Sequence, residues 1–480
     1  MSTGLPRDIS EIRAGLKQII SEVIGTDLAD IDEEASLLEY VTSSLDLLAG
    51  IRMVYDKYGV LIPLRPLLEG SGSLKALAAF VEQALQMHEK NLQASVMREA
   101  EAKADGPRVA LTPSQAHVGF LARYSSGASA AYNEPVAIRL EGPLHGPALQ
   151  TGFEAAVQRH EGSRATLNAN DDSLSFATAG TLSVSHVAEA DLERRLAALA
   201  SKPFEVGEPL FRAELLRLGE TEHVLVLVGH ALAMDRATML RVLGDIAQFY
   251  GVFAQNAGLV EGPTPEEANT QVATASERLA AEAYWKAAFA SGLPVLHLPT
   301  DRQRPAVKSY AGKRLAVDVP PELRDAPSTL VFAALACFLH RLSAQNESVV
   351  GAESASSREM LPIRSVYDPA QSFADYARNI AAQLAAADAH CHFSLAEIIR
   401  QLDLPRDQSR SAVLSAAFRT EAYGAAPAFG GLHSTFAMPP VETARYDIEW
   451  RLRSSELGMQ LCADYSDELF ETATVQRWTS

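Results

Sequence analysis

The first part of the chain alternates apolar and polar positions at the spacing of α-helices. Residues 9–24, ISEIRAGLKQIISEVI, place isoleucine, leucine and valine three and four positions apart, which predicts an amphipathic helix. A second helix is predicted over 45–59, ending at a glycine, and a third over about 74–85. Three short helices with an acidic loop after the first predict an all-α bundle with a thin core over residues 1–87.

The pattern changes after this bundle. Residues 88–107 are charged, rich in alanine and free of large aromatic residues, which is typical of a partly helical linker. Beyond them, strand-like runs such as VAIRL and HVLVLVGH alternate with helical runs such as TMLRVLGDIAQFYGVF, and a second series begins near residue 314. The alternation predicts an α/β fold in two lobes, which we place at 108–290 and 291–480.

Composition narrows the functional classes. The chain has 42 basic and 60 acidic residues and a formal charge of -18, which disfavours nucleic acid as a partner because phosphate neutralisation supplies most non-specific affinity. No stretch approaches the roughly 18 consecutive apolar residues of a bilayer span, so no membrane association is expected. The N-terminus lacks a signal-peptide pattern and the three cysteines are widely spaced, so we expect a cytoplasmic protein.

A serine pair stands at the start of the second predicted helix. Ser44 is first of all a candidate helix cap. Its segment, LLEYVTSSLDLL, resembles the LGxDSL region of acyl and peptidyl carrier proteins, with Ser44 and Leu45 at the modified serine and its leucine. The resemblance implies that Ser44 carries 4′-phosphopantetheine, whose phosphate is favoured beside the free N–H groups of a helix N-terminus. Val41 and Ser43 depart from the family pattern, and Ser43 is the competing attachment site.

From about residue 109 the chain resembles the condensation domains of nonribosomal peptide synthetases. The resemblance rests on several segments in the family's order, which include LTPSQAHVGFLAR with Ser114 and Gln115, the RHExxR match at 159–164, KPFEVGEPLFRAELLRL and ARYDIEWRL. It implies two chloramphenicol-acetyltransferase-like lobes with a tunnel between them, which two carrier arms enter from opposite sides. The whole chain is thus expected to be multidomain, an all-α carrier bundle followed by an α/β condensation domain.

The family signature HHxxxDG is damaged in this chain. The corresponding residues run from His230 to Arg236, and Ala231 stands at the second histidine. The family's imidazole at that place assists the nucleophile or stabilises the intermediate, so its loss predicts impaired amide formation, since general acid–base assistance is typically worth ~10²–10⁴-fold. Asp235 is retained and is expected to be structural, paired with Arg302 or Arg304.

The residues flanking Ala231 leave two further expectations. His230 follows an apolar run and is expected to be a hydrogen-bonded core histidine rather than a catalytic base. Arg236 replaces the family's glycine, where an arginine changes the loop or the tunnel floor or recruits a carboxylate. The family's GFFVNT segment is expected to be deleted between Gly351 and 372, which predicts an altered bridging element over the tunnel.

A metal site is not expected. The His390-Cys391-His392 cluster lacks the spacing of structural zinc sites, and no second ligand cluster lies nearby in the sequence. Cys337 lies on an apolar helix face and is read as a core residue.

Three hypotheses for the function stay open at this point. The first is an assembly-line protein that presents a thioester on Ser44 to a divergent condensation domain. The second is an active catalyst that uses His230, Arg236 or substrate-assisted chemistry, and the third is a non-catalytic docking scaffold. The implied partners are a phosphopantetheinyl transferase, an upstream loading, adenylation or polyketide module, and a downstream carrier protein.

Overall fold

The computed structural model describes most of the chain beyond residue 107 and parts of the segment before it. The described residues are 9–24, 27, 31–32, 50, 53–54, 57–58, 73–82, 108–169, 171–176, 182–254, 274–357, 359–401, 409–411, 413–456 and 458–480. The chain divides into two compact units, 1–105 and 106–480, each with its own contacts. Within the described residues, no helix combines the length and apolar character needed to cross a bilayer.

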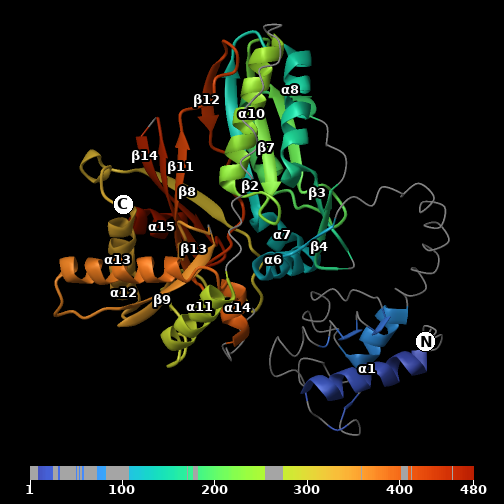
Figure 1. The fold of residues 1–480 in the computed structure, drawn as a ribbon, viewed down its shortest axis with the longest axis vertical. Helices are drawn as coiled ribbons and strands as arrows, with labels where there is room; N and C mark the ends of the chain where they lie inside the picture. Colours follow the sequence, from blue (N-terminus) through green and yellow to red (C-terminus); the bar gives the residue numbers. More distant parts are fainter. Residues whose placement is uncertain are drawn as a thin grey trace. The chain divides into compact units, whose positions relative to one another are not determined.

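The first unit contains helix α1 (Ile9–Ile24), which has the predicted bounds (Figure 1). Its apolar face is buried at Ile12, Leu16 and Ile19, as the spacing predicted. Residues 74–82 are also helical, with Leu74 and Val81 fully buried. The described part of this unit is therefore helical with an apolar interior.

The N-terminal lobe of the second unit is built on a five-stranded sheet of order β12-β2-β7-β6-β5 (Figure 1). The strands are β2 (Asn133–Glu141), β5 (Leu182–His186), β6 (Phe211–Arg217), β7 (Glu222–His230) and β12 (His433–Ala437). Helices α8 (Gly146–Arg159) and α10 (Arg236–Ala254) pack on one face of it, where Val136, Ile138 and Leu225 are buried.

Smaller elements complete this lobe on the opposite face of the sheet. They are α6 (Pro113–Tyr124), α7 (Ser126–Ala131), α9 (Leu192–Ser201), the short helices η3 (Glu161–Arg164) and η4 (Glu189–Asp191), and a sheet of β1 (Val109–Ala110), β4 (Ser173–Phe176) and β3 (Ala165–Leu167). Leu196 of α9 and Leu167 of β3 share a core cluster with Val224 and Val226 of β7. The sheet is thus covered on both faces.

The C-terminal lobe is built on a six-stranded sheet of order β10-β9-β11-β13-β14-β8. The strands are β8 (Lys313–Asp318), β9 (Glu347–Glu353), β10 (Met360–Val366), β11 (Ala416–Gly424), β13 (Ile448–Ser455) and β14 (Gly458–Tyr465). The helices are α11 (Ala275–Ala288), η5 (Pro321–Leu323), α12 (Ser328–Ser343), α13 (Phe373–Ala389), α14 (Leu395–Gln401) and α15 (Thr472–Thr479). Helices α11, α12 and α13 and the sheet enclose one core around Phe332, Ile380 and Trp450.

Two elements cross the lobe boundary that the sequence predicted at 290. Helix α11 buries Ala281 and Trp285 in the C-terminal core, so it packs with that lobe. Strand β12 comes from the C-terminal half of the chain but pairs antiparallel with β2, from His433 opposite Glu141 to Ala437 opposite Ala137. The two lobes are therefore interleaved, because each half of the chain supplies an element to the other.

Candidate functional site

The loop that carries Ala231 leaves β7 at the edge between the two lobes. Its first turn closes through hydrogen bonds from the Ala233 and Met234 N–H groups to the His230 carbonyl, at 2.9 and 3.0 Å. The Ala231 N–H donates to the Tyr132 carbonyl at 2.9 Å, and Gln115 Nε2 donates to the Leu232 carbonyl at 2.8 Å. Contacts from two other elements thus fix the backbone at the altered signature residue.

The RHExxR segment supports the same loop through close packing. A Cβ at Gly162 would lie 2.5 Å from the Ala233 carbonyl oxygen, so only a glycine lets η3 approach this closely. His160 Nε2 lies 2.8 Å from Asp245 Oδ2, which joins the end of α8 to α10, and Arg159 contacts the same carboxylate at 3.5 Å. This motif therefore positions the loop rather than taking part in its chemistry.

His230 is completely buried at the end of β7. Its Nδ1 accepts a hydrogen bond from the Leu232 N–H at 3.3 Å, which places the ring proton on Nε2. Nε2 has no partner with hydrogen-bond geometry, although the Ser129 carbonyl lies near it. Burial lowers the pKa of His230 to about 3, and nearby Arg445 acts in the same direction. The imidazole is thus neutral and enclosed by protein.

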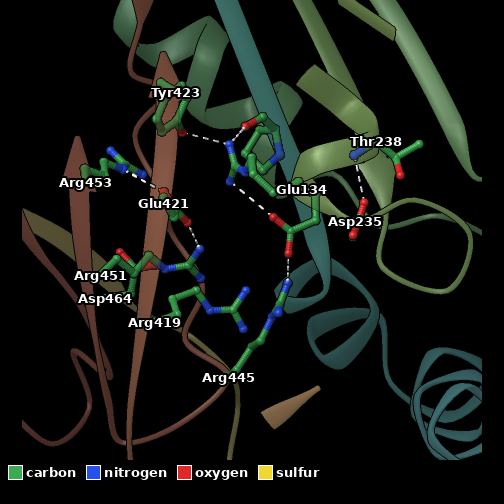
Figure 2. A network of polar contacts seen from close by, with 12 residues as sticks. Glu134, Asp235, Thr238, Arg419, Glu421, Tyr423, Arg445, Arg451, Arg453 and Asp464 are labelled. Carbon is green, nitrogen blue, oxygen red and sulfur yellow. Dashed lines mark hydrogen bonds and ion pairs between the residues drawn. The ribbon is translucent and has the colours of Figure 1, made fainter. Parts of the chain in front are cut away.

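The partner predicted for Asp235 is wrong. Asp235 is exposed, and its Oδ1 accepts a hydrogen bond from the Thr238 N–H at 2.7 Å, which caps the N-terminus of α10 (Figure 2). Arg304 instead pairs with the buried Asp447, with Nη1 2.9 Å from Oδ1, and Arg302 donates to the Asp467 carbonyl. An N-cap needs only a hydrogen-bond acceptor three residues before a free N–H group. Asp235 supplies that acceptor for the Thr238 N–H.

The side chain of Arg236 lies between the two lobes. It belongs to a group of four side chains that we call the interlobe ion cluster, namely Glu134, Arg236, Tyr423 and Arg445. Its guanidinium lies 3.2 Å from Glu134 Oε2 and donates to the Tyr423 hydroxyl at 2.9 Å. Arg445 reaches Glu134 Oε1 from the other lobe at 2.6 Å (Figure 2). One carboxylate on β2 therefore joins cations from both lobes.

The electrostatics of this cluster keep Glu134 ionised. Burial raises the pKa of Glu134, but Arg445 and Arg236 lower it by more, to about 2. Arg445 also lies over the Tyr132 ring at 4.8 Å and donates to the Ala131 carbonyl at 2.7 Å. Since the Tyr132 carbonyl accepts from the Ala231 N–H, the cluster lies beside the altered signature loop.

The cluster continues into what we call the charged sheet face, a set of ionised side chains on the C-terminal sheet. Arg451 stands at its centre and contacts Glu421 at 2.7 Å and Asp464 at 2.8 Å (Figure 2). It also contacts Glu449 at 2.6 Å. The members are Arg314, Glu353, Arg419, Glu421, Glu449, Arg451, Arg453 and Asp464. Arg453 and Glu421 are 3% and 6% exposed, so these ions are buried between the lobes rather than solvated.

The space left between these ions is very small. A cavity lined by the Arg236, Arg445 and Arg451 side chains, and by Ala130 and Ala131 from α7, has a volume of about 20 Å³. A site needs roughly 10–15 Å³ to hold one water molecule. This cavity thus has room for a water molecule.

Sequence reasoning missed Glu134, Arg445 and the charged sheet face. The segment IEWRLRSS alternates apolar and charged residues, a pattern that is typical of a strand with one face in water. The available signal was the mixture of signs, because both glutamate and arginine occur on the same face of β11 and β13 and can pair there.

Several predicted residues lie elsewhere or outside the described residues. Ser44, its competitor Ser43 and Arg358 fall outside them. His390 ends α13, with Nδ1 2.7 Å from the Ala386 carbonyl and its ring stacked on Tyr284 at 4.3 Å. Among the residues that the structure describes, no group of three or more metal-binding side chains is assembled.

Family comparisons agree with this architecture. The model of the condensation domain matches residues 107–480, and the model of the phosphopantetheine attachment site matches 14–81. A plipastatin synthase protein of Bacillus subtilis (strain 168) is 23% identical over 99% of this chain, and tyrocidine synthase 2 of Brevibacillus parabrevis is 27% identical over 87%. The chain covers 14% and 12% of the length of these two relatives.

Solved structures share the fold of the second unit. The X-domain from teicoplanin biosynthesis is 23% identical with a TM-score of 0.65, and the match covers 79% of this chain and 94% of that one. A complex of the X-domain and OxyB from teicoplanin biosynthesis matches at 24% identity, with a TM-score of 0.63 over 79% of this chain and 92% of that one. The prediction of a carrier unit followed by a condensation unit is confirmed. The chain belongs to the condensation-domain family and joins to it a carrier domain bearing 4′-phosphopantetheine, as in nonribosomal peptide synthetases.

Proposed function

We propose that this chain carries an acyl or aminoacyl thioester on a phosphopantetheine attached to Ser44, and that its condensation unit binds loaded carriers without forming the amide bond. Ser44 lies within the matched attachment-site region, at the position that resembles the family's modified serine. A phosphopantetheinyl transferase and neighbouring synthetase modules are the partners that a carrier domain requires. An upstream loading, adenylation or polyketide module would supply the acyl group, and a downstream carrier would receive it.

The observation that carries the proposal is the combination of Ala231 with the interlobe ion cluster. A methyl group stands where the family has an imidazole, so no side chain of that residue can move a proton. The adjacent space holds the buried Glu134, Arg236 and Arg445 side chains and a cavity of about 20 Å³. A carrier arm that entered between these side chains would have to separate the ion pairs, which is costly for buried charges.

A catalytic role for His230 is disfavoured by its surroundings. The ring is fully buried, and its Nδ1 lone pair is already occupied by the Leu232 N–H. A general base must come within hydrogen-bond reach of the proton that it removes. Arg236 likewise spends its donors on Glu134, Tyr423 and the Pro135 carbonyl. The atoms that remain unpaired, His230 Nε2 and Arg236 Nε, are both buried.

A role in docking has a precedent in the fold. The X-domain, which shares the architecture of the second unit, forms a complex with OxyB. This precedent concerns that protein, and we extend to the present chain only the idea that the outer surface of a condensation fold can serve binding. Docking needs no tunnel, so it is compatible with Ala231 and with the buried ions.

The attachment of the arm is tested by mass spectrometry. The full chain is incubated with coenzyme A and a phosphopantetheinyl transferase, and the intact mass is measured. We expect one phosphopantetheine to be added to the unaltered chain and to Ser43→Ala, and none to Ser44→Ala. An unchanged gain of mass in Ser44→Ala would overturn the assignment of the serine.

The absence of amide formation is tested with reconstituted carriers. The loaded full chain is mixed with an acceptor carrier that bears an aminoacyl group, and amide product is measured against a mixture whose condensation unit is omitted. We expect equal, background rates, with complex formation between chain and carrier retained. Amide formation above background that is lost in His230→Gln, with unchanged unfolding, would establish the catalytic alternative instead.

A further inference from the structure

A second polar site lies at the end of the N-terminal sheet that is remote from His230. His186, Arg217 and His223 form a row across β5, β6 and β7, because His186 is the register partner of Arg217 and Arg217 is the partner of His223. Direct register partners place their side chains on the same face of a sheet. His223 and His230 stand at opposite ends of β7, so this row is distinct from the interlobe ion cluster.

The row lines a cavity of about 340 Å³. The other lining residues are Leu144, Leu218, Gly219 and Glu220, from the turn between β6 and β7 and the approach to α8. The N-terminus of α8 lies beside Arg217, since a Cβ at Gly146 would lie 3.5 Å from Arg217 Nη2. A helix of 14 residues contributes a partial positive charge at this end.

Two members of this row have donors without partners in the part of the chain that the structure describes. His223 is 3% exposed, and neither of its ring nitrogens has a partner with hydrogen-bond geometry, although the Glu220 carbonyl lies near enough to favour the protonated ring. Arg217 Nε is likewise buried without a partner, and no described carboxylate forms an ion pair with this guanidinium. Buried polar groups are normally satisfied, so this pair offers donors to a ligand or a water molecule in the cavity.

We propose that His186, Arg217 and His223 bind an oxyanion of the phosphate or carboxylate class. Arg217 supplies the charge and the forked donor geometry that suits such oxygens, and His223 supplies a donor from the buried side of the cavity. Glu220 is the one acidic side chain in the described lining, and its carboxylate competes with the ligand for Arg217. The site is therefore expected to bind a free oxyanion weakly while Glu220 is ionised. It should bind the oxyanion more tightly when Glu220 is neutral.

Burial of the ring is consistent with this assignment. Burial lowers the pKa of His223, and Arg217 lowers it further. The titratable or charged groups around the ring are Arg217 on β6, His186 on β5, Glu220 in the turn and His145 before α8, whose Nδ1 accepts from the Ala148 N–H at 3.1 Å. An anion placed among them would stabilise the protonated ring and raise its pKa again.

The test is an NMR titration of the full chain labelled with ¹³C at histidine Cε1. The His223 signal is assigned from its loss in His223→Asn, and inorganic phosphate, methyl phosphate and acetate are added separately at constant ionic strength. We expect a saturable shift of His223 and His186, with none at His340, which is buried in the other lobe. The three ligands distinguish a free phosphate, a phosphate ester and a carboxylate as the preferred oxyanion.

Variants separate a built site from general attraction. Loss of the guanidinium in Arg217→Gln is expected to weaken binding about tenfold, as for a charge-assisted contact, and Glu220→Gln is expected to tighten it by a few fold. Arg194→Gln, an exposed arginine of the same lobe, is the matched control and should bind as the unaltered chain does. Shifts that do not saturate with any of the three ligands, or equal affinity in Arg217→Gln and Arg194→Gln, would overturn the proposal.

Discussion

The two faces of strand β13, in the C-terminal sheet, are both inaccessible to solvent but differ completely in chemistry. On β13, Trp450 and Leu452 point into the apolar core, while Glu449, Arg451 and Arg453 point towards the other lobe. All five of these residues are between 0% and 6% exposed. The apolar face is stabilised because its hydrocarbon side chains are removed from water. On the charged face, attraction between opposite charges offsets the cost of removing the ions from water.

Burial alone therefore does not determine how a protein surface responds to a substitution. On the apolar face, the cost of a substitution follows the volume that is lost. On the charged face, it follows the charge that is left without a partner, so removing two opposite charges costs less than removing one.

Tryptophan fluorescence can report on the unfolding of the condensation unit in all of the stability experiments. The three tryptophans, Trp285, Trp450 and Trp478, belong to the condensation unit, and the carrier unit has none. Tryptophan fluorescence during chemical unfolding therefore follows the condensation unit by itself.

The largest effect is expected at the centre of the charged sheet face. Arg451→Met leaves Glu421, Glu449 and Asp464 without their shared cation. Stranding buried charge in this way typically costs about 3–5 kcal/mol. We expect the free energy of unfolding of the condensation unit to fall by that amount, measured by urea unfolding at pH 7.

A second substitution sharpens this result. In Arg451→Met with Glu449→Leu, every remaining ion keeps an opposite partner, in the pairs Arg419 with Glu353, Arg453 with Glu421 and Arg314 with Asp464. The double variant should therefore recover most of the stability lost by the single one. Additive losses from the two substitutions would mean that the charged face behaves like the apolar one.

The next effect concerns the interlobe ion cluster and depends on pH. Glu134 has a pKa of about 2 instead of 4.5, because Arg445 and Arg236 outweigh its burial. A depressed pKa in the folded state contributes stability that is complete above the unfolded value and is lost as the pH falls through the folded one. The shift corresponds to about 3 kcal/mol at pH 7.

Glu134→Gln is the matching experiment. The gap in unfolding free energy between the unaltered chain and this variant should be widest at neutral pH and should narrow as the pH falls from about 5 towards 2. Urea unfolding across this range gives the gap directly, and other groups that titrate cancel in the difference. A gap that stays constant with pH would show that Glu134 contributes through packing rather than charge.

A smaller loss is expected on the apolar face. Trp450 is fully buried, but its Nε1 has no hydrogen-bond partner, so Trp450→Phe removes volume without breaking a hydrogen bond. Trimming a buried ring in this way is expected to cost about 1–2 kcal/mol, less than full truncation to alanine. The loss is measured by urea unfolding with Trp285 and Trp478 as probes. A loss as large as that of Arg451→Met would contradict the distinction between the faces.

The sequence predicted those parts of the fold that are encoded in short windows. The periodicity of 9–24 predicted α1 with its observed bounds, and the apolar run ending at His230 predicted β7. The signature match identified Ala231 and Arg236 as unusual residues but did not predict which side chains they contact. It could not predict that Arg236 meets Glu134, because these residues are distant in sequence and a charge in a strand is most often solvated.

The prediction for Asp235 went wrong for a related reason. An ion pair with Arg302 or Arg304 was expected from family resemblance, whereas the structure shows a local N-cap and gives Arg304 to Asp447. Long-range pairing depends on where two loops meet in space, which no sequence window contains. Capping depends on four consecutive positions, 235–238, and the acidic residue before α10 was sufficient to indicate it.

The smallest predicted effect decides between these two roles of Asp235. As an exposed N-cap, Asp235 should contribute about 1 kcal/mol, so Asp235→Ala should lower the free energy of unfolding by that amount and Asp235→Ser should restore most of it. A cap is independent of Arg304, so the losses of Asp235→Ala and Arg304→Met should add in a double-mutant cycle. If the two losses were instead coupled, and serine failed to rescue, Asp235 and Arg304 would interact in solution and the two lobes would meet differently at this loop.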